Sequence, residues 1–198
     1  NSKVFLKNEQ GLYILDIPSQ TVIKEKPTDS MELTCFRLSH DSSVLACICG
    51  NRIVKLLDAY TLEEKLTIDC SGAIPKAVFF DPWDETLFIA FHDHSVGRFS
   101  TADGTLVSML DKKVEGLVDI LFDEGKNIFI TIGKAESYLG KTESFIWHND
   151  TNKAVGRIPD LCTADLESGR LFIITYDKFQ ILPIFDLPML FEEAEWQL

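Results

Sequence analysis

Residues 44–58 read VLACICGNRIVKLLD. A continuous apolar run comes first, a Gly-Asn pair follows, and a second β-type run ends in leucine and aspartate. Glycine and asparagine tolerate the backbone of a tight turn, so the two runs are predicted to pair as an antiparallel hairpin. The unbroken apolar character of residues 44–49 indicates a strand that is buried on both faces.

Two further runs complete this unit. Residues 33–38 (LTCFRL) alternate as a strand does and lead into a dense polar turn at residues 39–43, while residues 65–68 (KLTI) follow the hairpin. Outer strands alternate because successive side chains point to opposite faces, of which only one is buried. The unit is therefore predicted to be a four-stranded antiparallel sheet whose second strand is the most buried.

The same unit recurs along the chain. In each copy the third strand ends in a bulky residue followed by a polar one, and the bulky residues are Leu15, Leu57, Phe99, Trp147 and Phe185. Neighbouring copies lie 42, 42, 48 and 38 residues apart. A period in this range, with several strands in each unit, is typical of β-propeller blades. The predicted repeats span about 1–28, 29–70, 71–112, 113–160 and 161–198, and the first lacks an obvious innermost strand.

The repeats resemble those of the WD-repeat β-propeller family over nearly the whole chain. The best match is NRIVKLLD at residues 51–58, which stands where that family has a strand ending in Trp-Asp. Ile146-Trp147-His148 keeps the tryptophan without the aspartate, and three other copies keep the aspartate without the tryptophan: Leu15-Asp16, Leu57-Asp58 and Phe185-Asp186. The Gly-His pair that usually begins a family repeat is missing throughout. The resemblance implies protein partners bound on the loop-bearing faces of the blades.

The predicted fold class is all-β: a β-propeller of four-stranded antiparallel blades, with about four to five blades in residues 1–198. Propellers close with about 4–8 blades. Two arrangements stay open: a closed five-bladed ring, or a segment of a larger ring, commonly seven-bladed in the WD family. A first residue other than methionine and an incomplete first repeat favour the second arrangement, as part of a longer multidomain polypeptide.

Composition narrows the classes of partner. The formal net charge is −12 and no cluster of lysine and arginine occurs, which argues against nucleic-acid binding, because neutralising phosphates requires such clusters. No apolar stretch approaches the ~18–20 residues that span a bilayer, so membrane insertion is not expected. The N-terminal residues also lack the apolar core of a signal peptide.

Cysteine usage indicates a reducing compartment. Five cysteines, at positions 35, 47, 49, 70 and 162, give an odd count and no disulfide framework. Cys47 and Cys49 are predicted to share one face of a strand as small buried hydrophobes, and no CxxC pair or neighbouring histidine suggests zinc. Reduced thiols favour a cytoplasmic location, with the nucleus as the other option.

The histidines are the obvious candidates for catalysis or metal binding. His92 and His94 would lie on one face of an extended segment as a two-point ligand set, although a polar hairpin turn explains them equally well. His40 precedes an aspartate in a turn, where the carboxylate commonly accepts local backbone N–H groups. No serine or cysteine lies in a nucleophile-elbow context. We therefore predict no catalytic, cofactor-binding or metal-binding residues and no cofactor.

The 48-residue interval carries an insertion, roughly residues 133–144. Within it, residues 135–142 (AESYLGKT) match a relaxed phosphate-loop pattern. The chemistry of that motif needs a glycine-rich cradle followed by a helix, whereas here alanine replaces the first glycine and the following residues are strand-like. A long hairpin tip is the preferred interpretation. Elsewhere, Asn149-Asp150-Thr151 is a formal glycosylation acceptor in a turn, and residues 191–198 would form an outer strand or a short helix.

The function favoured by the sequence is a non-catalytic protein–protein interaction scaffold whose partners are other proteins or other domains of the same polypeptide. Propeller blades hold loops rigidly around a channel and offer broad binding surfaces without a cofactor. The alternative is a propeller enzyme: a hydrolase that uses acidic and histidine side chains, or a nucleotide binder that uses Gly140-Lys141-Thr142 in the 133–144 loop.

Overall fold

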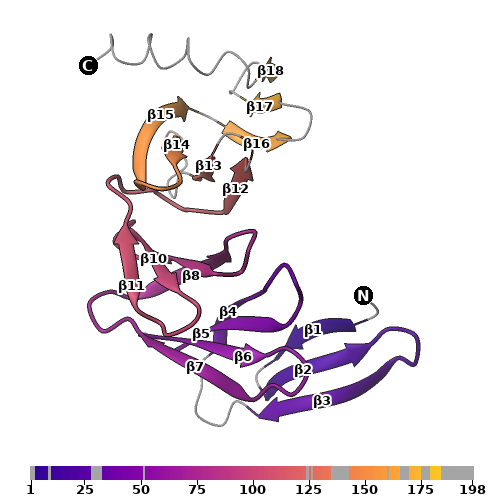
Figure 1. Cartoon of the computed structure of the whole chain (residues 1–198). Helices are drawn as coiled ribbons and strands as arrows, with labels where there is room; N and C mark the ends of the chain where they lie inside the picture. The colour runs from indigo at the N-terminus through magenta and orange to yellow at the C-terminus, as the bar shows by residue number, and fades with distance from the viewer. Residues whose placement is uncertain are drawn as a thin grey trace. The chain divides into compact units, whose positions relative to one another are not determined.

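The computed structural model describes residues 3–8, 10–27, 33–50, 52–123, 125, 127–134, 143–159, 161–165, 170–174 and 179–183, from residue 159 onward by their backbone alone. The described residues form β-strands and no α-helix. They build five antiparallel sheets, each made of strands that are consecutive in the chain (Figure 1). No helix in this described part is long and apolar enough to cross a membrane.

The five sheets follow one another along the chain. The first contains β1 (Lys3–Lys7), β2 (Gly11–Asp16) and β3 (Thr21–Pro27). The second contains β4 (Leu33–Leu38), β5 (Val44–Cys49), β6 (Ile53–Asp58) and β7 (Glu64–Asp69). The third contains β8 (Pro75–Phe80), β9 (Thr86–Phe91), β10 (Val96–Ser100) and β11 (Leu106–Met109). The fourth contains β12 (Asp119–Asp123), β13 (Ile128–Ile132), β14 (Glu143–His148) and β15 (Lys153–Pro159). The fifth contains β16 (Leu161–Asp165), β17 (Arg170–Ile174) and β18 (Phe179–Pro183).

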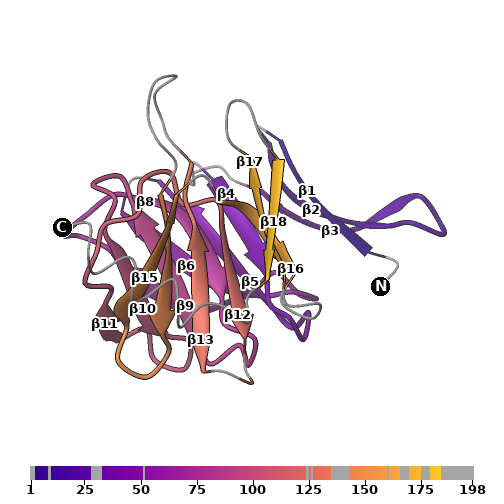
Figure 2. The ribbon, with the colours of Figure 1, turned by 90° about the horizontal axis from the view of Figure 1, so that it is seen from above.

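The chain divides into two compact bodies. The N-terminal body comprises Asn1–His92 and Phe99–Val107, and the C-terminal body comprises Asp93–Arg98 and Ser108–Leu198, so the division passes through β10. Figure 2, turned by 90° from Figure 1, shows β1, β2 and β3 of the first sheet side by side. In the first sheet β1 and β2 correspond to the second and third strands of a repeat, so the predicted lack of an innermost strand holds for the described residues.

Strand β5 is buried on both faces, as its apolar sequence predicts. Leu45, Cys47 and Cys49 pack in a cluster with Leu12 and Ile14 of β2. The alternate residues Ala46 and Ile48 point the other way and pack with the third sheet, in a cluster that includes Val78 and Phe80 of β8 and Leu87 and Ile89 of β9. One strand therefore joins two cores, and the sheets of the N-terminal body stack against each other through it.

Irregularities in the ladders recur at equivalent points of the repeats. The pairing of the third and fourth strands shifts register at Ile14/Leu15, at Leu56/Leu57 and at Ile146/Trp147, in each case immediately before the bulky residue that marks the repeat. A β-bulge bends and twists its strand. The repeated bulge therefore gives the first, second and fourth sheets the same local irregularity, although the residues that form it differ.

The turns between third and fourth strands also repeat. A residue with left-handed backbone stands at Gln20, Leu62, Gly104 and Asn152, with φ between 53° and 75°. These positions lie 42, 42 and 48 residues apart, as the repeats do. The left-handed region is costly for residues with a Cβ, so glycine is the easiest choice there, yet only one copy has it. The four copies therefore share this backbone conformation although their residue types differ.

The C-terminal body is built around an aromatic core in the fourth sheet. Trp147 of β14 is fully buried and stacks on Phe129 of β13, with ring centroids 5.9 Å apart and an interplanar angle of 9°. Its indole Nε1 donates to the hydroxyl of Thr131 at 2.9 Å. The only polar atom of the ring is thereby satisfied inside the core, as a buried indole requires.

Removing side-chain volume from β5 should destabilise the fold far more than the same change on an exposed position. Ile48→Ala is expected to lower the free energy of unfolding by about 2–5 kcal/mol, because it deletes apolar contacts and leaves a cavity. Ile53→Ala in the neighbouring strand β6, where the side chain is 38% exposed, should cost less than about 1 kcal/mol. Urea denaturation of both variants measures the difference, and equal costs would contradict the stacked arrangement.

Candidate functional site

Four turns of the N-terminal body form the candidate site. In the second sheet they are residues 39–43, between the first and second strands, and residues 58–63, between the third and fourth strands. The equivalent turns of the third sheet are residues 81–85 and 100–105. Antiparallel strands reverse direction at every turn, so these two turns of a sheet share one end. Ala59 N–H donates to the carbonyl of Ser43 at 2.9 Å and Thr101 N–H donates to that of Glu85 at 3.0 Å, which joins the turns within each sheet. We call these four turns the turn face.

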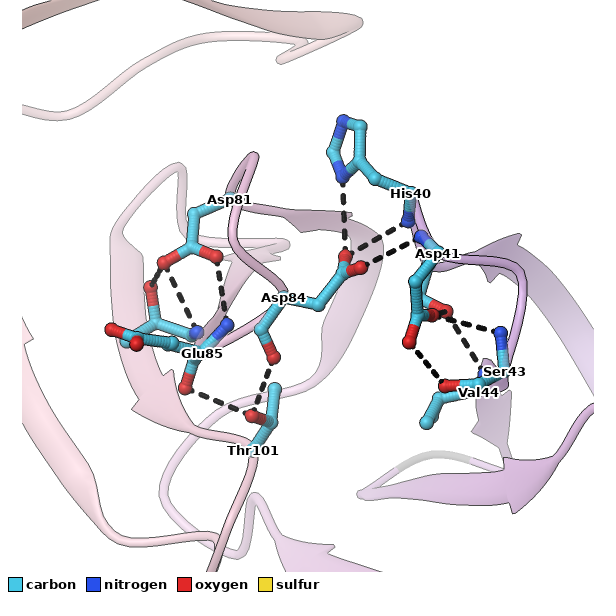
Figure 3. A network of polar contacts seen from close by, with 10 residues as sticks. His40, Asp41, Ser43, Val44, Asp81, Asp84, Glu85 and Thr101 are labelled. Carbon is cyan, nitrogen blue, oxygen red and sulfur yellow. Dashed lines mark hydrogen bonds and ion pairs between the residues drawn. The ribbon is translucent and has the colours of Figure 1, made fainter. Parts of the chain in front are cut away.

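Asp84 links the two sheets across this face (Figure 3). One carboxylate oxygen accepts the backbone N–H of His40 and the other accepts that of Asp41, both at 2.9 Å. The ring Nδ1 of His40 lies 3.2 Å from the first oxygen. Asp84 has a left-handed backbone, with φ of 58°, which the turn after β8 imposes. Hydrogen bonds to an ionised acceptor are about twice as strong as neutral ones, so this single carboxylate is a substantial inter-sheet contact.

The carboxylate of Asp81 is buried and holds the same turn together by hydrogen bonds. Asp81 is 1% exposed, and its carboxylate accepts the backbone N–H groups of Glu85 and Thr86 at 2.9 and 3.1 Å and the Thr86 hydroxyl at 2.5 Å. A buried carboxylate is tolerated only where several donors replace water. Thr101 extends the network, since its hydroxyl donates to the carbonyls of Asp84 and Glu85 (Figure 3).

The other turns use aspartate in the same way. Asp58 Oδ1 accepts the N–H groups of Tyr60 and Thr61 at 2.9 Å, and its Oδ2 lies 3.1 Å from the ammonium of Lys65. The two backbone hydrogen bonds and then Lys65 hold the pKa of Asp58 well below its usual range. Hydrogen bonds from Ser43 and Thr105 likewise lower the pKa values of Asp41 and Asp103. These carboxylates are therefore ionised throughout the neutral range.

Two aromatic side chains project from this acidic surface. Trp83, between Asp81 and Asp84, is 48% exposed, and Tyr60 in the second sheet is 57% exposed. The ammonium of Lys3 from β1 lies over the Tyr60 ring, 4.7 Å from its centroid. Large aromatic side chains that are exposed on rigid turns are uncommon on surfaces that only contact solvent, and they are typical of interaction surfaces.

The structure separates the histidines that the sequence singles out. His40 lies on the turn face and contacts Asp84. His92 and His94 flank Asp93, whose carboxylate accepts the N–H and the hydroxyl of Ser95 in a local turn. His148 ends β14, and its Nδ1 is a buried atom without a hydrogen-bond partner. Within the described ranges no group of three or more His, Cys, Asp or Glu residues is arranged to hold a metal ion.

The other sequence candidates contribute little to a site. The phosphate-loop-like residues 135–142, with Lys141, lie outside the described residues, and so does the segment 191–198. Cys47 and Cys49 share one face of β5, as predicted, and burial raises the pKa of both thiols. Burial also raises the pKa of Cys70 to about 11. Thiols held protonated in this way are poor nucleophiles.

Sequence reasoning did not identify Trp83 and Tyr60 as a surface. The available signal was a large aromatic residue inside each of two polar turns, at Asp81-Pro82-Trp83-Asp84 and Asp58-Ala59-Tyr60-Thr61. An aromatic residue in such a turn is either folded back into the core or left exposed, and one sequence does not distinguish the two. In the structure both Trp83 and Tyr60 are left exposed at the surface.

Solved structures share this fold. A chain of Kuenenia stuttgartiensis hydrazine synthase aligns with a TM-score of 0.67 at 14% identity, over 86% of this chain and 51% of that one. A chain of a mitotic checkpoint complex aligns with a TM-score of 0.68 at 15% identity, over 91% of this chain and 57% of that one. The chain thus spans about half the length of these structures, and at such identities the likeness concerns the fold alone. No protein-family model matches the sequence, and no curated protein matches it significantly.

The predicted fold class is confirmed. The chain has the all-β fold of a partial β-propeller, made of antiparallel sheets, of which three have four strands and two have three strands in the described residues.

Removing the carboxylate of Asp84 should weaken the contact between the second and third sheets. Asp84→Gly is the cleanest change, because glycine accepts the left-handed backbone, and it should lower the free energy of unfolding by about 1–3 kcal/mol. Asp84→Asn keeps one acceptor and should cost less, while His40→Ala, which removes an exposed ring, should cost less than about 0.5 kcal/mol. Urea denaturation ranks the variants by their free energy of unfolding, and an unchanged value in Asp84→Gly would contradict the proposed link.

Because the pKa values of the turn aspartates are low, the stability of the fold should depend on pH in the acidic range. A carboxyl whose pKa is lower in the folded than in the unfolded chain contributes stability above its unfolded pKa of 3.8, and this contribution is lost as pH falls through the folded value. The melting temperature is therefore expected to fall between about pH 4 and pH 2. Asp58→Asn should lower it at pH 7 and flatten its fall in acid. An equally steep fall in this variant would show that Asp58 does not contribute.

Proposed function

We propose that this chain is a non-catalytic, cytoplasmic protein-interaction scaffold of the WD-repeat type. Its partners are other proteins or other domains of the same polypeptide, and it needs no cofactor. The observation that carries the proposal is the exposure of Trp83 and Tyr60 on turns that are fixed by carboxylate–backbone hydrogen bonds. Side chains presented on a rigid frame lose little conformational freedom when they bind, which favours a well-defined interface.

Two further observations support the WD-repeat type. Trp147 occupies the third-strand position where the resemblance places a tryptophan, and its indole bonds to Thr131 of the adjacent strand. The ladder bulge before Trp147 recurs before Leu15 and Leu57, so these three positions are equivalent in structure. One of the similar solved structures is a mitotic checkpoint complex, and an assembly role in that protein agrees with partner binding in this one.

Partner capture tests the proposal. The wild-type chain, Trp83→Ala/Tyr60→Ala and the control Ile53→Ala/Ile74→Ala would each be immobilised and exposed to a cell lysate, and the retained proteins identified by mass spectrometry. The control removes two exposed apolar side chains at the opposite ends of the second and third sheets, since Ile53 begins β6 and Ile74 directly precedes β8. A protein that binds the wild type and the control but not the turn-face variant is the expected result.

Equal recovery by all three chains would place binding elsewhere and remove the turn face from the proposal. A hydrolase screen of the wild-type chain adds the test against an enzyme. Turnover that is lost in His92→Ala would replace the scaffold by a catalytic function.

A further inference from the structure

The turn face is strongly acidic. Its four turns contain no lysine or arginine and seven carboxylates, which belong to Asp41, Asp58, Glu63, Asp81, Asp84, Glu85 and Asp103. The formal charge of the whole chain is −12. Cations contact this surface at its edge: Lys65 reaches Asp58, Lys3 lies over the ring of Tyr60, and the ammonium of Lys26 donates to the carbonyl of Leu62 at 2.6 Å.

The hydrogen bonds of the turns do not neutralise this charge. Asp58, Asp81 and Asp84 accept N–H groups, which are dipoles without net charge, so these hydrogen bonds fix the positions of the carboxylates without adding a counter-charge. Glu63 and Glu85 are exposed, and they join these turn hydrogen bonds through their backbone groups and not through their carboxylates. Hydrogen bonding within the turns therefore gives a structural reason for the aspartates. It gives none for the carboxylates of the two glutamates or for the exposed aromatic rings.

Tyr60 already accepts a cation. The Lys3 ammonium lies 4.7 Å from the centroid of its ring, which is cation–π geometry. Trp83 offers the larger and stronger π surface, and it is flanked by Asp81, Asp84 and Glu85. An aromatic face among carboxylates attracts lysine and arginine in two ways, since the ring binds the cation face-on and the carboxylates pair with its N–H groups.

We propose that the turn face binds a lysine- and arginine-rich, extended segment of a partner protein, with Trp83 and Tyr60 as the anchoring side chains. This inference rests on the proposed scaffold function and specifies the chemistry of its partner. Phosphate-bearing ligands would be repelled by the seven carboxylates. A purely apolar segment would bury the charges of Glu63 and Glu85 without a counter-ion, which is costly. Opposite charge in the partner satisfies both constraints and speeds association.

A charge-reversal experiment tests this proposal. The probe is a short, fluorescently labelled peptide of alternating arginine and serine, and its binding to the chain is followed by fluorescence anisotropy. Glu63→Lys/Glu85→Lys changes the turn face without touching its hydrogen bonds. The matched control, Glu25→Lys/Asp69→Lys, makes the same change in net charge at exposed positions of the same body, with Asp69 at the opposite end of its sheet.

The turn-face variant should bind the peptide at least about tenfold more weakly than the wild type, and the control should differ by less than about twofold. Trp83→Ala should weaken binding about fivefold, and Trp83→Phe should restore part of it, because a smaller aromatic ring still accepts a cation. Addition of salt should weaken all of these interactions.

Three results would overturn the proposal: no binding of the peptide by the wild type, equal weakening in the turn-face variant and the control, or no effect of Trp83→Ala. These results are distinguishable from a failure of the scaffold function. If Trp83 and Tyr60 are needed for partner capture but the peptide does not bind, the scaffold stands and the basic partner is wrong. If capture does not depend on them, the site itself is wrong.

Discussion

A strand that is apolar on both faces needs a sheet on each side of it, and the N-terminal body depends on this constraint. Strand β5 places Leu45 and Cys47 against the first sheet and Ala46 and Ile48 against the third. A single sheet would leave one of these faces in water, which costs roughly 25 cal/mol for each Å² of apolar surface. Stacking is thus a consequence of the sequence of one strand, and it brings the ends of neighbouring sheets together.

At those ends the ladders stop and backbone N–H groups lose their partners. Carboxylates take over this role: Asp58 within a turn, Asp81 inside a turn and Asp84 between two sheets. The same side chains therefore stabilise the fold and make the surface acidic. Because Trp83 and Tyr60 lie in the turns that these carboxylates hold, the proposed interaction surface is presented by the stabilising network itself and does not depend on a separate loop.

Much of the fold could be predicted from alternation and turn residues. The strands at Leu33–Leu38 and Val44–Cys49 have the predicted bounds, because each is a short apolar or alternating run next to polar turn residues. The bulges and the left-handed residues were not predicted. Gln20, Leu62 and Asn152 occupy a position where glycine is expected, so the residue type carries no signal and only the backbone shows the equivalence. The candidate site was not predicted: the histidines and residues 133–144 were the candidates in the sequence, and no site residue was assigned.

By itself, the sequence determined the period, the antiparallel sheets, the doubly buried second strand and the excess of acid, because all of these follow from neighbours along the chain. Tertiary structure alone decided which turns meet. Asp84 and His40 lie 44 residues apart, and their contact exists because β5 and β8 pack in one core and align the ends of their sheets. It also decided that Trp83 and Tyr60 stay exposed while neighbours along the chain, such as Leu62 and Phe80, are buried. Exposure depends on what the rest of the fold has packed, and local sequence does not contain that information.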